Sequence, residues 1–154
     1  ERRKAKGEWR KAKGESWMKP DFSTQLERGM KHFNALQFWE AHEAWEEIWL
    51  VAESDVEQFL QGLIQLAAAY HHVRRGTFRG GVRLFDAALR RLSAFPAGFC
   101  GLDRSEAESA ARQHRQWAAD VVARAKDERP GDDAYPKLGR VGQDVPLIPP
   151  FENW

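Results

Sequence analysis

From residue 21 onward, hydrophobic residues recur every three or four positions, which is the period of an α-helix that buries one face. No segment alternates between apolar and polar residues as a half-buried strand does. The pattern predicts helices from Ser23 to about Phe33, Gln37 to Ala52, Ser54 or Asp55 to Arg74 or Arg75, Thr77 to about Phe95, and Arg104 to about Lys126. We therefore expect an all-α protein, an antiparallel bundle of about five helices.

Residues at the ends of these segments support the predicted limits. Ser23 and Thr77 are suitable N-caps, and Asp103 with Glu106 has the spacing of a capping box. Gly76 can end the third helix in a left-handed conformation that other residues avoid.

The third predicted helix is apolar over most of its circumference, which is typical of a helix with neighbours on more than one side. Its apolar residues are Phe59, Leu60, Leu63, Ile64, Leu66, Ala67, Tyr70 and Val73. Polar residues occupy one stripe, formed by Gln61, Gln65 and His72 together with Ala68. We expect this helix at the centre of the bundle.

The sequence outside the periodic region predicts two further segments. Residues 1–20 are expected to be a flexible basic extension, and residues 21–129 the helical domain. Residues 130–154 are rich in Pro and Gly and are expected to form an irregular tail packed on that domain. An alternative for the extension is an arm that tethers the protein to RNA or a membrane, because its Lys and Arg residues alternate with Trp.

The formal charge of +1 is distributed unevenly. Residues 1–19 hold eight Lys or Arg against three Glu, which leaves the rest of the chain with a net charge of −4. Nucleic-acid binding is therefore not expected outside the extension. The single cysteine, Cys100, forms no intramolecular disulfide and is expected to be a buried, unreactive thiol. No apolar run has the ~20 residues that span a bilayer and no secretory signal is recognisable, so a cytoplasmic location is expected.

Candidate chemistry lies on the second and third predicted helices. His42 and Glu46 are four residues apart, so their side chains can meet, and Glu46 would polarise His42 as an acid or base. The spacing does not match a zinc-protease motif, because a second histidine is missing from that helix. A mononuclear site for a divalent metal remains a hypothesis, with His42, Glu46 and His72 as ligands and Gln61 or Gln65 behind them.

Two other interpretations of the same residues stay open. In one, the polar stripe lines a pocket for a small polar ligand, walled by Trp39, Trp45 or Trp49. In the other, the stripe is a structural hydrogen-bond network in a helical interaction or oligomerisation module, with a homodimer as one outcome. The candidate catalytic residues are His42 and Glu46. The candidate binding residues are Glu43, Trp49, Gln61, Gln65 and His72.

Several motifs resemble a known family. These are Phe33-Asn34, Phe38-Trp-Glu-Ala-His42-Glu43-x-x-Glu46-x-x-Trp49, Gln61-Gly62-Leu63-Ile64-Gln65, His71-His72 and Gly76-x-x-x-Gly80. Together they resemble domain-of-unknown-function family 309 over about residues 24–93. The resemblance implies a small all-helical fold without an assigned reaction, and its pattern carries over onto His42, Glu43, Glu46, Trp49, Gln61, Gly62 and Gln65. The chain departs from that pattern at Leu36 and Thr77, both in turns.

Overall fold

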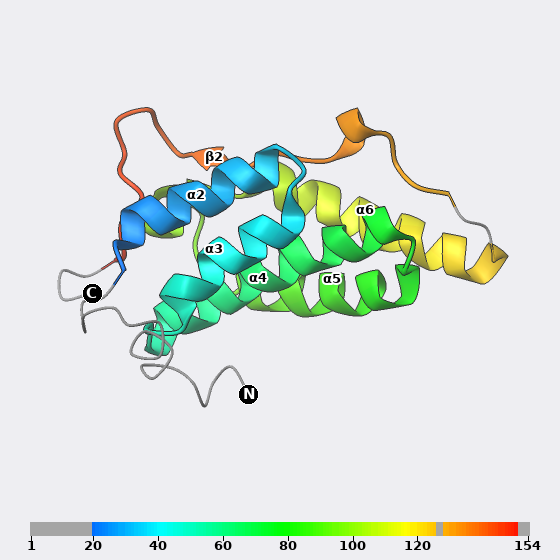
Figure 1. The fold of residues 1–154 in the computed structure, drawn as a ribbon, viewed down its shortest axis with the longest axis horizontal. Helices are drawn as coiled ribbons and strands as arrows, with labels where there is room; N and C mark the ends of the chain where they lie inside the picture. The colour runs from blue at the N-terminus through cyan, green and yellow to red at the C-terminus, as the bar shows by residue number, and fades with distance from the viewer. Residues whose placement is uncertain (1–19, 126–127, 151–154) are drawn as a thin grey trace.

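The computed structural model describes residues 20–125 and 128–150. That part of the chain contains the α-helices α2 (Phe22–Asn34), α3 (Phe38–Trp49), α4 (Ser54–Arg75), α5 (Phe78–Leu92) and α6 (Ser105–Arg124) (Figure 1). The short elements are the 3-10 turns η1 (Phe99–Gly101) and η2 (Asp132–Ala134) and the strands β1 (Leu102–Asp103) and β2 (Gly139–Arg140). The predicted all-α class is confirmed. Of the predicted basic extension, residues 1–19 lie outside the described residues.

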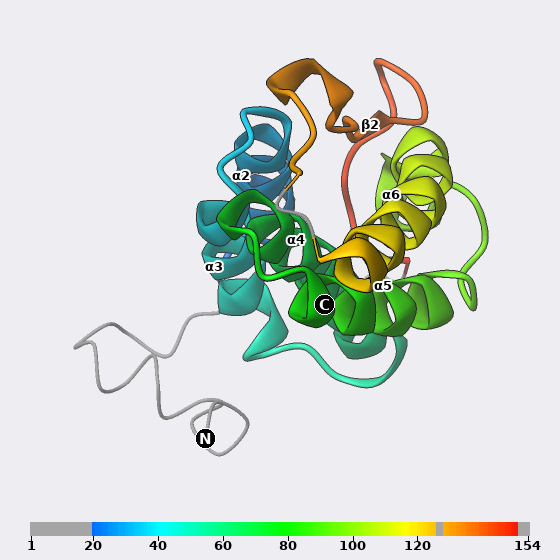
Figure 2. The ribbon, with the colours of Figure 1, turned by 90° about the vertical axis from the view of Figure 1, so that its right-hand side faces the viewer.

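The five helices pack in the order in which they occur, each against the next. The connection from α5 to α6 contains η1 and β1. Viewed nearly end-on, they form an arc, and the chain after α6 passes across the open side of that arc between α2 and α6 (Figure 2). The central helix of the arc is α4, as its apolar circumference predicts. Leu60, Leu63, Leu66 and Tyr70 on α4 are fully buried.

The core of the bundle is a cluster of aromatic rings around Tyr70. Its ring contacts Phe33 at 5.9 Å, Phe38 at 5.3 Å and Phe85 at 4.9 Å between centroids. The Tyr70 hydroxyl lies 2.8 Å from Nδ1 of His114 on α6, so the buried oxygen has a partner. Tyr70 thus joins α2, α3, α5 and α6 to the central helix.

The segment after α6 fills the inside of the arc with apolar side chains. Tyr135, Leu138 and Leu147 are each less than 5% exposed. The Asn34 side chain at the end of α2 donates to the Leu138 carbonyl and accepts from the Leu138 N–H, both at 2.8 Å. The pairing of β1 with β2 adds a ladder of two residues on each strand, which is too short for an alternating sequence pattern to predict.

Several helix limits and two predicted helix caps differ from the prediction. Helix α3 ends at Trp49 instead of Ala52, and α5 ends at Leu92 instead of Phe95. The predicted capping box is wrong: Asp103 accepts from the N–H of Ser105 at 3.0 Å, whereas Glu106 accepts from the backbone of Lys137. The predicted cap at Ser23 is also wrong, because α2 already begins at Phe22.

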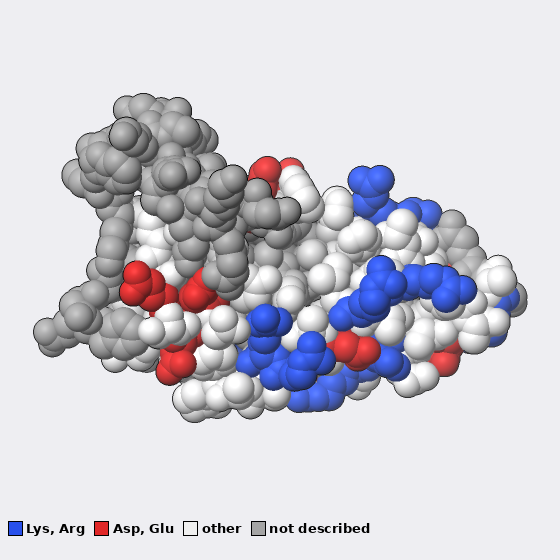
Figure 3. Space-filling model, turned by 90° about the horizontal axis from the view of Figure 1, so that it is seen from below, with Lys and Arg blue, Asp and Glu red and all other residues white. Residues whose placement is uncertain are grey.

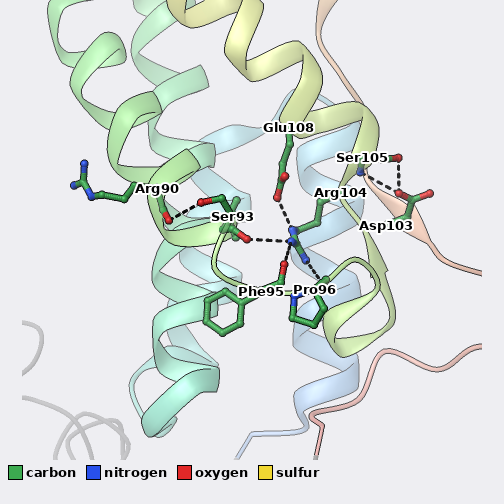
Figure 4. A network of polar contacts seen from close by, with 9 residues as sticks. Arg90, Ser93, Phe95, Pro96, Asp103, Arg104, Ser105 and Glu108 are labelled. Atoms are coloured by element: carbon green, nitrogen blue, oxygen red, sulfur yellow. Dashed lines mark hydrogen bonds and ion pairs between the residues drawn. The ribbon is translucent and has the colours of Figure 1, made fainter.

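A buried arginine fastens the end of α5 to the start of α6 (Figure 4). The guanidinium of Arg104 donates to the carbonyls of Leu92 and Phe95, both at 3.1 Å, and to that of Pro96 at 3.4 Å. It also pairs with the Glu108 carboxylate at 2.7 Å. Arg104 is 6% exposed, so these bonds are shielded from water. Cations are favourable at helix C-termini, so the charge of Arg104 stabilises this end of α5.

Candidate functional site

His42, the predicted catalytic histidine, is buried on α3. It is 5% exposed, and its ring stacks on the indole of Trp39 with 4.6 Å between centroids and 10° between planes. The indole itself is 45% exposed. Trp39 therefore lies between His42 and the surface on that side. Among the other predicted residues of α3, Glu46 is half-buried, Glu43 is exposed and Trp49 is buried.

A row of rings leads from His42 to the end of α4. Trp39 contacts His71 at 5.2 Å between ring centroids, and His71 contacts His72 at 6.2 Å. Both histidines belong to the last turns of α4 and are half-buried. The structure thus links His42 and His72, which are both candidate site residues from the sequence. The link runs through Trp39 and His71, and His71 is not among those candidates.

His72 is held by the turn that joins α4 to α5. The N–H of Thr77 donates to the His72 carbonyl at 2.9 Å, and the Thr77 hydroxyl donates to the same oxygen at 3.1 Å. The hydroxyl oxygen also lies 2.6 Å from Nδ1 of His72. The Thr77 hydroxyl has one hydrogen to donate, so it makes both contacts at once only when Nδ1 of His72 carries a hydrogen. A neutral His72 then has its lone pair on Nε2.

This turn depends on glycine at two positions. Gly76 ends α4 with φ of 82°, a left-handed conformation. A Cβ on Gly80 would lie 3.2 Å from Nδ1 of His72, so a larger residue would press on the ring. Thr77 is the N-cap residue of α5, as predicted, but its side chain bonds to His72 and not to the first amides of the helix.

An open groove surrounds these side chains. Trp39, His71, His72, Arg75 and Thr77 line a cavity of about 490 Å³, which we call the histidine groove. The pKa of His71 is lowered by partial burial and by Arg75, with Glu40 opposing. The pKa of His72 is lowered by partial burial and by the positive charges of Arg75 and Arg83. Both imidazoles are therefore neutral near pH 7 in a positively charged setting.

The glutamines of the polar stripe lie further along α4. Gln61 and Gln65 are half-buried. The guanidinium of Arg91 on α5 donates to Gln65 at 3.3 Å and to Gln58 at 3.2 Å. The amide oxygen of Gln65 therefore serves the contact between α4 and α5. This bond is of the kind that the structural-network interpretation expects.

The predicted metal ligands are not assembled. Within residues 20–125 and 128–150, no group of three or more His, Cys, Asp or Glu side chains is close enough to hold a metal ion. His42, Glu46 and His72 accordingly do not form such a group. Cys100 is a free, buried thiol, as predicted, and burial raises its pKa to about 12, so it is protonated at neutral pH.

Arg75 and Thr77 complete the groove, and sequence reasoning does not select either as a site residue. The sequence around the turn between α4 and α5 does contain a signal for both residues. His71 and His72 are followed within five residues by Arg75, Gly76 and Thr77, so the end of α4 and the turn after it carry two rings, a cation and a hydroxyl within seven residues. Turns positioned by rigid helices are common places for binding residues.

The fold and groove define a small all-helical protein with a candidate ligand site at one helix turn. Residues 26–84 match the model of the family described as Domain of unknown function (DUF309). This match confirms the resemblance predicted from the motifs, and the matched segment covers less than half of the chain. It includes α3, α4 and the turn that forms the histidine groove.

A relative from Aquifex aeolicus (strain VF5), described as an uncharacterized protein, is 29% identical over 82 residues. The matched segment covers 53% of this chain and 25% of that relative. No solved structure gives a significant match. In the part of the chain that the structure describes, no helix combines the length and apolarity needed to cross a membrane.

Proposed function

We propose that the protein binds a small anionic ligand in the histidine groove. The observation that supports this proposal is the lining of the groove, which combines a cavity of about 490 Å³ with Trp39, two neutral histidines and Arg75. An aromatic wall and a few polar groups are typical of small-molecule sites. The guanidinium of Arg75 suits a phosphate or carboxylate, because it can donate two parallel hydrogen bonds.

A bound anion would also reverse the electrostatic balance at the histidines. Arg75 and Arg83 disfavour the protonated form of His72, and a negative charge beside the ring would favour it. Protonated His72 would then be a third cation near the ligand, in addition to Arg75 and Arg83. In the absence of ligand, the Nε2 lone pair of His72 is a candidate general base, because Thr77 holds the opposite side of the ring.

The test is a titration with inorganic phosphate and with pyrophosphate, followed by NMR of the imidazole carbons. We expect saturable shifts at His71 and His72 and a higher pKa for His72 in the complex. Arg75→Gln should weaken binding by about tenfold, the effect of one charge-assisted hydrogen bond. The matched control is Arg28→Gln on α2, which should bind as the wild type does. Absence of a saturable shift with both anions would contradict the proposal.

The catalytic role of His42 and Glu46 stays a prediction within this proposal. If His42 performs acid or base chemistry, His42→Ala should abolish the activity and leave the melting temperature nearly unchanged. If the ring is a structural support for Trp39, the same substitution should destabilise the protein by about 2–5 kcal/mol, as in other large-to-small substitutions of buried side chains. A thermal melt of the variant separates the two outcomes before any substrate is known.

A second candidate function is that of a helical interaction module. It is favoured by three exposed apolar side chains near the end of the described chain, Val141 at 48%, Val145 at 37% and Ile148 at 50% exposure. Light scattering of the purified protein would test it. A homodimer that dissociates in the Val145→Ser/Ile148→Ser variant would support this function, and a monomer at all concentrations would count against self-association.

A further inference from the structure

One face of the bundle carries a stripe of exposed arginines. On α5, Arg79, Arg83 and Arg90 occur at spacings of four and seven residues, so they lie on the same side of the helix. Arg75, at the end of α4, continues the series, and all four side chains are exposed. We call these residues the arginine face. Lys and Arg side chains gather on the underside of the molecule, where α5 lies, and acidic side chains are mostly at one end (Figure 3).

The acidic residue within this stripe is already paired. Asp86 lies between Arg83 and Arg90, and Arg115 of α6 holds its two carboxylate oxygens at 2.9 Å and 3.2 Å. In contrast, no hydrogen bond or ion pair joins the guanidinium of Arg75, Arg79, Arg83 or Arg90 to another residue in the described part of the chain. Like charges at this spacing repel, so folding alone gives no reason for the cluster.

We propose that the arginine face binds a nucleic acid through its phosphodiester backbone. At a rise of 1.5 Å per residue, Arg79 and Arg83 are about 6 Å apart along α5, and Arg79 and Arg90 about 16 Å. A strand laid along this helix would therefore pass several phosphates near guanidinium groups. The shape of the guanidinium suits phosphate oxygens, and neutralising backbone phosphates releases counterions.

The surroundings of the stripe favour this partner over a protein or a membrane. Protein interfaces and membrane-bound helices place large apolar or aromatic residues at the centre of contact. The large hydrophobic side chains that are exposed in the described residues are Trp39, Val141, Val145 and Ile148, and none belongs to α5. Along α5, the arginine face offers cations without exposed apolar anchors, which suits a backbone of regularly spaced charges.

The inference goes beyond the proposed function, because Arg79 and Arg90 do not line the histidine groove. It also revises the expectation drawn from net charge. The chain from residue 20 onward has a net charge of −4, yet residues 74–92 contain six arginines and one acidic residue. Segregation of charge onto one face produces a local positive potential that the total conceals.

The experiment is fluorescence anisotropy of the full chain with a labelled 20-nucleotide RNA, the same sequence as single-stranded DNA, and its DNA duplex. The test variant is Arg79→Gln/Arg90→Gln. The control is Arg28→Gln/Lys31→Gln on α2, which removes the same charge from another helix. Residues 1–19 are present in every protein, so their contribution is the same throughout.

We expect the test variant to lose at least tenfold in affinity for one of the three probes at low salt, and the control less than twofold. On single strands, the slope of log K against log salt should fall in magnitude by about 1.4, or about 0.7 for each lost contact. The probe that binds most tightly identifies the source of the phosphodiester chain. The phosphate titration at His72 should be unchanged in the test variant, which separates this inference from the proposed function.

Three results would overturn the inference. One is equal loss in the test and control variants, because it would assign binding to total charge or to residues 1–19. Another is the absence of binding to all three probes. The third is equally tight binding of poly-glutamate, because it would point to acidic proteins as the partner. Melting curves of both variants exclude unfolding as a cause, since the substituted side chains are exposed.

Discussion

The bonds of Arg104 predict that this buried side chain is a main source of stability. In Arg104→Met, an unbranched chain of similar length keeps most of the packing on Phe59, over which the guanidinium lies at 5.2 Å. The substitution removes the charge and four hydrogen bonds: to Glu108, and to the carbonyls of Leu92, Phe95 and Pro96 (Figure 4). The loss is therefore electrostatic and not a cavity.

The size of the effect follows from which partners water can reach. Pro96 is exposed, so its carbonyl can bond to water. The buried Leu92 carbonyl keeps its bond from the Phe95 N–H at 3.1 Å but loses the charge-assisted bond from Arg104, at a cost of about 1–2 kcal/mol. The Glu108 side chain is 16% exposed and loses a charge-assisted bond of about 1.5–3 kcal/mol. We expect a total of about 3–5 kcal/mol, the range for removing one partner of a buried ion pair.

The assay is urea unfolding followed by circular dichroism. Arg124→Met is the control, because Arg124 also pairs with a glutamate four residues away but is 48% exposed. It should cost less than about 1 kcal/mol. Adding Glu108→Leu to Arg104→Met should recover part of the loss, because the lone carboxylate is then removed. A loss for Arg104→Met no larger than that of the control would refute the reasoning.

Two further predictions concern the core. Burial lowers the pKa of His114 below 6.5, so the unfolded chain takes up its proton first, and stability should be full above pH 6.5 and fall as the pH drops below it. Melting temperatures between pH 7.5 and 5.0 should show this fall, and His114→Gln should reduce it. Gly29→Ala should cost about 1–3 kcal/mol in urea unfolding, because its Cβ would overlap the indole of Trp45. Gly139→Ala is the control, with nothing within 4 Å of the new atom, and should be nearly neutral.

The helices could be predicted because hydrophobic residues recur at the helical period within each of them. Along the 22 residues of α4, apolar residues cover most of the circumference and polar residues recur on one stripe, and Gly76 supplies a conformational reason to stop. The ends of α3 and α5 could not be predicted in this way. At the end of α5, the carbonyl of Leu92 accepts a hydrogen bond from Arg104, twelve residues later. A bond between segments far apart in the chain leaves no trace in a local pattern.

The candidate site shows the same division. Helical spacing places His42 and Glu46 on one side of α3, and His72 on the polar stripe of α4. Spacing within one helix does not give the rotation of that helix against its neighbours, so it could not tell that Trp39 of α3 contacts His71 of α4. The bond from Thr77 to His72 also contradicts the local rule that an N-cap side chain serves its own helix.

Charge is the property for which the total is least informative. Asp86 and Asp132 count against the arginines in the net charge of the chain, but Arg115 and Arg74 already neutralise them in the folded protein. The charge that an approaching ligand meets is the charge of the side chains that are not in such pairs. That charge is positive from Arg75 along α5, and the histidine groove lies at one end of it. A phosphate in the groove and a phosphodiester chain on the arginine face would therefore share Arg75, so each should weaken the binding of the other if both proposals hold.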